Sequence, residues 1–187
     1  MIWEELYHTS LYWKLSGRND SRARTLADRH YSRQTPGAFE FCPPGNNIVL
    51  LALNDDALWV SHRPDPKAHL RQPRMDGFQY WDNPYFRNES DHLASEMIRE
   101  AVAVTLQLWQ DELPPDGFHS FVDPKKVRPT MRRGRPVYGY CFDRAGFSLC
   151  PELTKERKLM RYILTAEQLR HIIPLEPVRE QLRLFAL

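Results

Sequence analysis

The sequence has little glycine, few cysteines and no long apolar run, and each shortage excludes a class of protein. Eight glycines among 187 residues fall below the usual share of about 7%, and neither a GxGxxG nor a GxxxxGK loop occurs, so dinucleotide-binding and P-loop folds are excluded. The three cysteines, Cys42, Cys141 and Cys150, form no CxxC pair. This is typical of free thiols in a reducing compartment and argues against a zinc site. The longest apolar run, Ile48–Leu53, is far shorter than the ~20 residues that span a bilayer.

Neither sign of charge is in excess, since 26 Lys and Arg residues against 24 Asp and Glu residues leave a formal net charge of +2. A uniformly basic, histone-like nucleic-acid binder is therefore excluded, although a locally basic face is not. The N-terminal stretch MIWEELYH has two acidic residues where a signal peptide carries basic ones, and no long apolar segment follows it. We expect a soluble, intracellular protein with no membrane partner.

Apolar and aromatic residues are abundant enough to form one hydrophobic core. Hydrophobic residues make up 42% of the chain and aromatic residues 12%, and no internal repeat divides it. We expect one domain over residues 1–164. A helical tail over residues 165–187, broken by Pro174 and Pro177, is expected to pack on the same domain.

Hydrophobic periodicity predicts an alternation of helices and strands. Helices are predicted over Asn19–His30 and Leu93–Glu112, and a proline-containing loop over Tyr31–Asn47. The predicted strands are Ile48–Leu53, Ala57–His62, Phe78–Phe86, Phe118–Val122, Val137–Phe142 and Leu159–Leu164. The first two strands are apolar at successive positions, as in a sheet covered on both faces, and Pro84 marks a bulge or an end in the third. With two helical crossovers and otherwise antiparallel joins, this order predicts an α/β (α+β) fold with a mixed, mostly antiparallel central sheet flanked by helices.

His30, Tyr31 and Ser32 follow the first predicted helix and begin the proline-containing loop. Together they offer a general base, a phenol and a hydroxyl within one turn, a set suited to managing the proton of an exocyclic amine. The alternative is structural, with the histidine interacting with the helix dipole and the tyrosine packed beside it.

Polar residues at the ends of other predicted elements are further candidates. Asp123 follows an apolar strand, where open α/β sheets place their chemistry, or it simply starts a turn before the next proline. Arg87 and Asn88 lie at a strand–helix junction, from which they would reach a ligand at the helix N-terminus; alternatively, Arg87 pairs with a neighbouring acid. Ser95, in the first helical turn, is a candidate substrate contact or a cap of the helix.

Residues 125–135 form a basic segment that contains no acidic residue. Its basic members are Lys125, Lys126, Arg128, Arg132, Arg133 and Arg135. Such a segment supplies phosphate contacts to a nucleic acid, and the aromatic Tyr140 that follows it, like Trp81 in an earlier strand, is a candidate to stack on an extruded base. A second basic cluster lies between Arg63 and Arg74. The alternative is a solvated charged face.

The order of elements, together with the stretch CFDRAGF from Cys141 to Phe147, resembles the GNAT superfamily of acyltransferase-like folds over roughly residues 21–164. In that superfamily the loop between the central strand and the long helix reads Q/R-x-x-G-x-G/A and binds acetyl-CoA. This chain keeps Arg87 at that loop and lacks both glycines. Glu89 and Asp91 in the same loop would repel a pyrophosphate, so we do not expect acetyl-CoA as the cofactor.

Four short motifs resemble a narrower group, the phage Mom-like DNA-modification proteins: DRHYS at residues 28–32, FRNE at 86–89, VDP at 122–124, and CFDRAGF. The resemblance implies a cytoplasmic, anti-restriction transferase of a bacterial or phage-infected cell. It would add a carbamoylmethyl-type group to the N6 amine of adenine in double-stranded DNA. The resemblance also implies an iron site, for which His30, Tyr31 and Asp123 are the candidate ligands, and an Arg87 that holds the transferred group.

Two other functions remain open at this point. One keeps the fold and changes the chemistry to acyl-CoA-dependent N-acetyl transfer onto an amine substrate. The other is a non-enzymatic nucleic-acid-binding module, in which the HYS and VDP motifs are only structural. The sequence also leaves open the donor of the transferred group, RNA or a free nucleotide as substrate, and the oligomeric state, a homodimer included.

Overall fold

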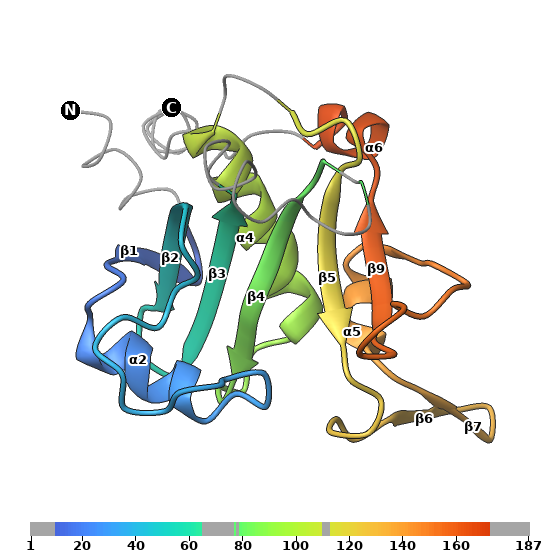
Figure 1. Ribbon diagram of the computed structural model, residues 1–187, viewed down its shortest axis with the longest axis horizontal. Coiled ribbons are helices and arrows are strands. Elements are labelled where there is room, and N and C mark those ends of the chain that lie inside the picture. Colours follow the sequence, from blue (N-terminus) through green and yellow to red (C-terminus); the bar gives the residue numbers. More distant parts are fainter. Residues whose placement is uncertain (1–9, 65–76, 78, 110–112, 173–187) are drawn as a thin grey trace, which may run out of the picture.

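The structure, a computed structural model, describes residues 10–64, 77, 79–109 and 113–172 (Figure 1). Its main sheet has the strand order β1-β2-β3-β4-β5-β9-β8, and β6 and β7 form a separate hairpin. The strands are β1 (Trp13–Ser16), β2 (Asn46–Ala52), β3 (Ala57–Arg63), β4 (Trp81–Asn88), β5 (Phe118–Val122), β6 (Thr130–Arg132), β7 (Arg135–Val137), β8 (Ser148–Leu149) and β9 (Met160–Leu164). The helices are α2 (Ser21–Asp28), α4 (Ala94–Leu108), α5 (Tyr140–Arg144) and α6 (Ala166–Arg170).

The central sheet is mixed and mostly antiparallel, which confirms the predicted fold class. Only β4 and β5 pair in parallel among the described strands, and α4 is the crossover between them. The prediction of a second helical crossover is wrong, because α2 joins β1 to β2 and these two strands are antiparallel. The sequence does not predict the short β1, WKLS, since four residues carry too little alternation to be detected.

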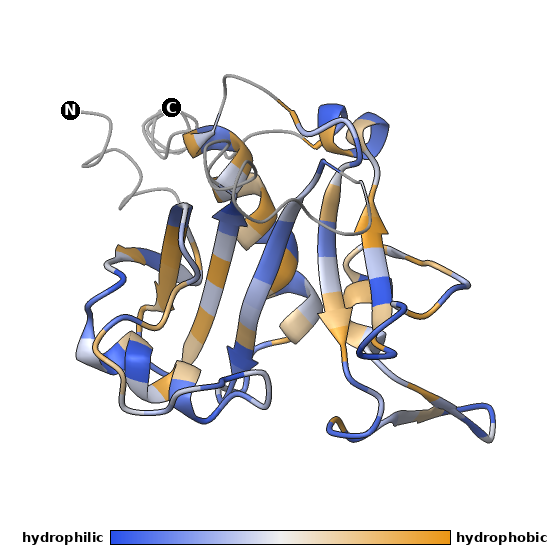
Figure 2. Ribbon diagram, in the orientation of Figure 1, coloured by the Kyte–Doolittle hydropathy of each residue, from blue (hydrophilic) through white to orange (hydrophobic). Residues whose placement is uncertain are grey.

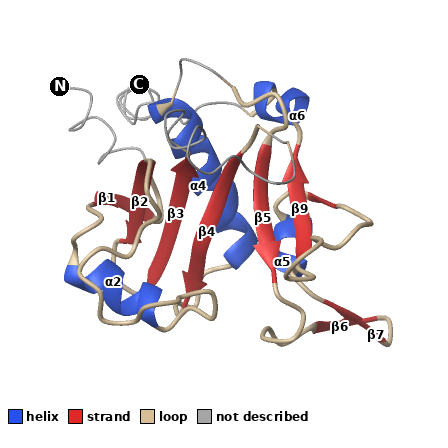
Figure 3. Ribbon diagram, viewed as in Figure 1, coloured by secondary structure: helices blue, strands red, loops and turns tan. Residues whose placement is uncertain are grey.

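The two apolar strands β2 and β3 have a separate core on each face, as predicted. On β2, Ile48 and Leu50 contribute to the core beneath α4, whereas Val49 and Leu51 contribute to the core beneath α2. Alternate side chains of a strand point to opposite faces, so a continuous apolar run serves both cores. Figure 2 shows hydrophobic residues concentrated on β2 and β3, and Figure 3 shows α4 crossing the sheet.

Both predicted helices form, and their buried residues follow the expected spacing. Asp20 caps α2 by accepting a hydrogen bond from the Arg22 backbone N–H. The apolar face of α4 is buried at the positions that its period requires, among them Met97, Ala101 and Thr105. The predicted end of this helix, residues 110–112, lies outside the described residues.

Two predictions about aromatic segments are wrong. The predicted strand Val137–Phe142 ends as β7 at Val137 and continues as helix α5, because Gly139 adopts a left-handed backbone conformation (φ +64°) that no strand contains. Trp81 is not available to stack on a base, since its side chain is 3% exposed and packs edge-on against Trp109 with ring centroids 4.9 Å apart. The hydrophobic effect favours burial of the large apolar surface of the Trp81 indole in the core.

The first turn of the predicted tail belongs to the same body as the sheet. Thr165 caps α6, and Leu169, 1% exposed, joins the core beneath α4. Residues 173–187, which include the two tail prolines, lie outside the described residues. Within the described part of the chain, none of the helices has the length and apolar character that a bilayer span requires.

Candidate functional site

A cavity opens where the parallel strands β4 and β5 separate. The two strands pair only at Trp81↔Phe118, Asp82↔His119 and Asn83↔Ser120. Pro84 follows directly and has no backbone N–H to donate, so the ladder cannot continue. An extra β4 residue is also accommodated here, between the pairs His62↔Asp82 and Val60↔Tyr85, which confirms the predicted bulge at Pro84. The bulge re-aims the following side chains, and Phe86 points into the cavity.

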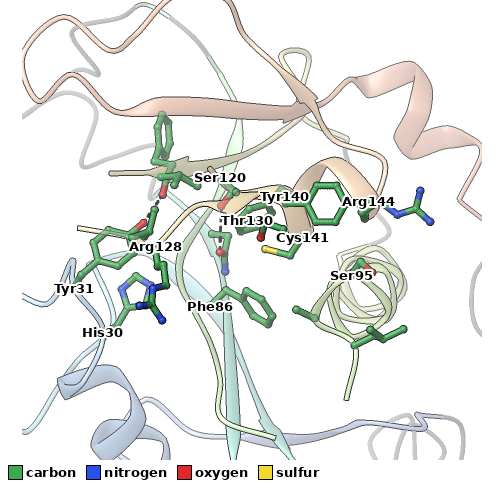
Figure 4. A pocket seen from close by; sticks show the side chains of 18 of the residues that line it. His30, Tyr31, Phe86, Ser95, Ser120, Arg128, Thr130, Tyr140, Cys141 and Arg144 are labelled. Carbon is green, nitrogen blue, oxygen red and sulfur yellow. Dashed lines mark hydrogen bonds between the residues drawn. The ribbon is translucent and has the colours of Figure 1, made fainter. Parts of the chain in front are cut away.

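This cavity, of about 400 Å³, has mainly aromatic and apolar walls with a few polar groups. Its aromatic lining residues are Tyr31, Phe86, Phe121, Tyr140 and Phe142, and its polar ones include His30, Asn83, Ser95, Ser120, Arg128, Thr130 and Arg144. Figure 4 shows His30, Tyr31 and Arg128 gathered on one side of the cavity and Ser95 and Arg144 on the other. Five residues proposed from the sequence, on four different segments, therefore share one cavity: His30, Tyr31, Ser95, Arg128 and Tyr140.

His30 is held in one orientation just beyond the end of α2. Its Nδ1 accepts a hydrogen bond from the Ser32 backbone N–H (3.2 Å) and lies 2.7 Å from the Ser32 hydroxyl oxygen. That hydroxyl also lies 3.2 Å from the Pro84 carbonyl oxygen, which ties the loop to the bulge of β4. Burial, with a smaller contribution from the positive charge of Arg87, lowers the pKa of His30 to about 4. The imidazole is therefore neutral at physiological pH, and its lone pair is on Nδ1, the atom that faces Ser32.

Tyr31 forms the neighbouring part of the same wall. Its hydroxyl donates a hydrogen bond to the Phe121 carbonyl oxygen (2.9 Å), and its ring centroid lies 4.4 Å from that of His30. Burial raises the pKa of Tyr31 to about 12, against a smaller lowering by a hydrogen bond from the Asp123 backbone N–H. Tyr31 thus supplies a phenol O–H, not a phenolate, to the cavity.

Acidification is expected to destabilise the protein through His30. Its pKa falls from an ordinary value of 6.5 to about 4 on folding, so between these pH values the unfolded chain binds a proton that the folded chain does not. The free energy of unfolding therefore decreases as the pH falls through this window, by about 3 kcal/mol at the lower end for this group alone. His30→Gln removes this titrating group. In thermal melts, the Tm of the variant is therefore expected to fall less than that of the wild type between pH 6.5 and pH 4. Equal pH dependence of both proteins would contradict a neutral, buried His30.

Asp123 and Ser32 adjoin the cavity without lining it. The Asp123 carboxylate accepts the Lys125 backbone N–H (2.9 Å), which is the turn-starting arrangement that the sequence left open for this residue. Ser32 lies behind His30 and orients its ring. Asp123 lies beside the Tyr31 hydroxyl, where its backbone N–H lowers the pKa of the phenol and its carboxylate raises it.

Arg87 and Asn88 belong to a network beside the cavity, outside its lining. Arg87 donates to the Glu89 carboxylate and, over 2.7 Å, to the Arg29 carbonyl oxygen. Glu89 also forms an ion pair with Arg29 (2.6 Å). The structure thus shows Arg87 paired with a neighbouring acid, which fastens the end of α2, and with it His30, to the end of β4.

Three backbone N–H groups of the loop before α4 already have hydrogen-bond partners. The Glu89 N–H donates to the Asp56 carbonyl oxygen (2.9 Å), the Ser90 N–H to Asn88 Oδ1 (2.9 Å) and the His92 N–H to Ser90 Oγ (3.2 Å). A pyrophosphate requires such groups to be unengaged and directed at the ligand. One of these donors, the His92 N–H, is engaged by Ser90, a side chain that stands at the position of the first glycine of the GNAT loop.

The three candidate iron ligands lie beside one another, and each has a hydrogen-bond partner in this arrangement. His30 Nδ1, the Tyr31 hydroxyl and an Asp123 carboxylate oxygen each contact a backbone group or Ser32. The described residues also contain no group of three or more His, Cys, Asp or Glu side chains placed to hold a metal ion. An iron site at His30, Tyr31 and Asp123 therefore stays a prediction that the resemblance makes.

The remaining predicted substrate contacts lie at and beyond the rim of the cavity. Lys125, Lys126, Arg132, Arg133 and Arg135 are exposed, on the connection after β5 and on the β6–β7 hairpin. The Arg132 guanidinium lies 4.3 Å above the Tyr140 ring, so the hairpin is attached to the cavity wall by a cation–π contact. Most of the second basic cluster, residues 65–74, lies outside the described residues. Its first member, Arg63, packs over the Trp109 ring and does not line the cavity.

Comparison with known proteins does not assign the chain to a family. No family model, curated protein or solved structure matches it.

Several lining residues are not predicted from the sequence. Asn83 and Ser120 pair with each other at the last rung of the β4–β5 ladder, as buried polar residues within strands. A polar residue in an otherwise apolar strand is a detectable signal, because burying it requires a hydrogen-bond partner. Arg144 and Cys141, by contrast, lie on α5, a helix that begins within the segment predicted as a strand.

Proposed function

We propose that this protein is a DNA-modifying transferase with a GNAT-like fold, related to the Mom-like group. It transfers a carbamoylmethyl-type group to the N6 amine of adenine in double-stranded DNA. The observation that carries this proposal is the aromatic cavity between β4 and β5, which has a neutral histidine and a protonated tyrosine on one wall and basic residues at its rim. These are the features that an extruded base needs: stacking surfaces, a proton acceptor and phosphate contacts.

The size of the cavity suits one base and a small transferred group. About 400 Å³ is at the lower end of the range for small-molecule sites, roughly 300–1,000 Å³. The N6 amine of a paired adenine is engaged in the duplex, so the base must leave the stack to react. Tyr31, Phe86 and Tyr140 offer faces on which a planar base can stack.

His30 is the proposed base for the reaction. The N6 lone pair forms the new N–C bond with an alkyl donor that carries the carbamoylmethyl group. The leaving group departs with its bonding electrons, and one amine proton passes to Nδ1 of the neutral imidazole, which gives up its hydrogen bond from the Ser32 N–H. The Tyr31 phenol stays protonated and orients the base by a hydrogen bond, and Asp123 and Ser32 support these two residues from outside the cavity.

The geometry of the loop before α4 favours this chemistry over acyl-CoA-dependent N-acetyl transfer. Three of its N–H groups are engaged, by Asp56, Asn88 and Ser90. An acetyltransferase of this fold would need those donors.

Mass spectrometry of nucleosides from the DNA of cells that express the chain tests the proposal. We expect a new nucleoside heavier than deoxyadenosine by one carbamoylmethyl group, and we expect Asp123→Ala to reduce it. A new mass on another base would change the assigned substrate. Unmodified DNA from cells that contain the folded protein would overturn the proposal, and thermal stabilisation of the protein by CoA would then favour the acetyltransferase.

A further inference from the structure

The β6–β7 hairpin projects from the body of the protein (Figure 1), and its residue Thr130 lines the cavity. Its pairs are Thr130↔Val137, Met131↔Pro136 and Arg132↔Arg135. The two residues that join the strands, Arg133 and Gly134, have φ values of +47° and +74°. Positive φ at both central residues is the condition for a type I′ turn, whose twist matches that of the strands it joins. The hairpin is therefore short, twisted and well defined.

The two faces of this hairpin differ in chemistry. Directly opposed residues share a face, and successive residues alternate. Thr130 lines the cavity and Arg132 covers Tyr140, so the face that carries them is turned toward the cavity. The opposite face carries Met131 and Pro136, which are exposed; Met131 is 61% exposed. An uncovered apolar pair on a basic hairpin has no role in the core of this protein.

The charge of the hairpin identifies the kind of partner. Arg132, Arg133 and Arg135 are exposed, and no carboxylate of the described residues forms an ion pair with them. The segment that leads into the hairpin adds further basic residues and no acid. A polyanion complements this charge, and apolar side chains between such arginines suit a polyanion with stacked bases.

We propose that the β6–β7 hairpin enters the minor groove of duplex DNA next to the target base, with Met131 and Pro136 as a wedge between base pairs. The arginines at its tip hold the flanking phosphates. Apolar side chains inserted at a base step unstack and kink the duplex, and the larger protein surface that the bent duplex touches offsets the cost of unstacking. This inference rests on the proposed function: the wedge lowers the cost of extruding the adenine, and the Arg132–Tyr140 contact links the hairpin to the cavity that receives it.

Fluorescence of a short duplex that contains 2-aminopurine tests the wedge, with the purified full-length chain. Wild-type protein is expected to bind the duplex and to raise the fluorescence, because the probe becomes unstacked. Met131→Ser is expected to bind within about threefold of wild type, since phosphate contacts dominate affinity, while most of the fluorescence increase is lost. Arg133→Gln is expected to weaken binding and to reduce the slope of log K against log salt by about one unit.

Leu153→Ser is the matched control, because Leu153 is also an exposed apolar residue (49%) and lies on a different loop. It should leave both binding and fluorescence unchanged. If Met131→Ser keeps the full fluorescence increase, or if the wild type binds and modifies DNA without unstacking the probe, the wedge is wrong and the proposed function stands. If the wild type does not bind duplex DNA at all, the proposed function fails together with the wedge.

Discussion

Replacing Tyr31 by Phe is expected to reduce base modification by roughly 100-fold, the loss that misplacement of a reacting group by about 1 Å causes. The substitution removes one oxygen atom from the cavity wall and leaves the aromatic ring in contact with His30. Loss of the hydrogen bond to the Phe121 carbonyl is expected to lower the free energy of unfolding by only about 1 kcal/mol. Quantification of the modified nucleoside, with a thermal melt of the same protein, measures both effects.

Tyr162→Phe is the control that separates chemistry from stability. Tyr162 also donates its hydroxyl to a backbone carbonyl, that of Tyr138, but it does not line the cavity. Its loss should cost a similar amount of stability and leave modification largely intact. If the two variants lose modification equally, Tyr31 has no special role in the reaction and acts through the fold.

Gly117→Ala is expected to have the largest effect on stability. Gly117 has a φ of +80°, and a Cβ atom there would lie 2.0 Å from the Leu164 carbonyl oxygen. The obstacle is the backbone of β9, which cannot move without breaking the β5–β9 ladder at Phe118↔Leu164. We expect a loss of about 4 kcal/mol or more, and with it a Tm decrease of roughly 10 °C for a domain of this size.

Gly37→Ala isolates the contribution of backbone conformation. Gly37 has a similar φ of +83°, but nothing lies within 4 Å of the position that its Cβ would take. It should therefore cost only the left-handed strain, about 1–2 kcal/mol. A Gly117→Ala protein that melts at the same temperature as Gly37→Ala would show that β9 yields to the new methyl group.

Residue types in regular spacing predict most of the framework. The hairpin of β2 and β3, the helix α4 and the strands β5 and β9 are found in this way, because apolar residues recur at the period of each element. The same reasoning misses β1, which is only four residues long. It also extends the strand at Val137 into α5, because the aromatic pattern VYGYCF does not reveal that Gly139 takes a left-handed conformation against the ring of Tyr162.

The sequence predicts part of the candidate site from the chemistry of its residues and from the resemblance, not from their spacing. His30, Tyr31, Ser95, Arg128 and Tyr140 are selected by chemistry and by resemblance, and the fold places all five around one cavity. The pair Arg87–Glu89 is local, and the sequence offers it as an alternative, but the contacts of both residues with Arg29 join positions about sixty residues apart in the chain. A local pattern contains no information on such pairs.

The class of fold, the main helices and strands, and the basic segment follow from the amino-acid sequence alone, because they depend on local periodicity and composition. The point at which β4 and β5 separate depends on tertiary contacts. The last pair between the two strands, Asn83↔Ser120, lies directly before the bulge at Pro84, and the register that places them together is not local in sequence. The protonation of His30 and Tyr31 is likewise a property of the folded chain, because burial sets the direction of both pKa shifts. The two faces of the β6–β7 hairpin depend on strand register, which a local pattern of residues does not reveal.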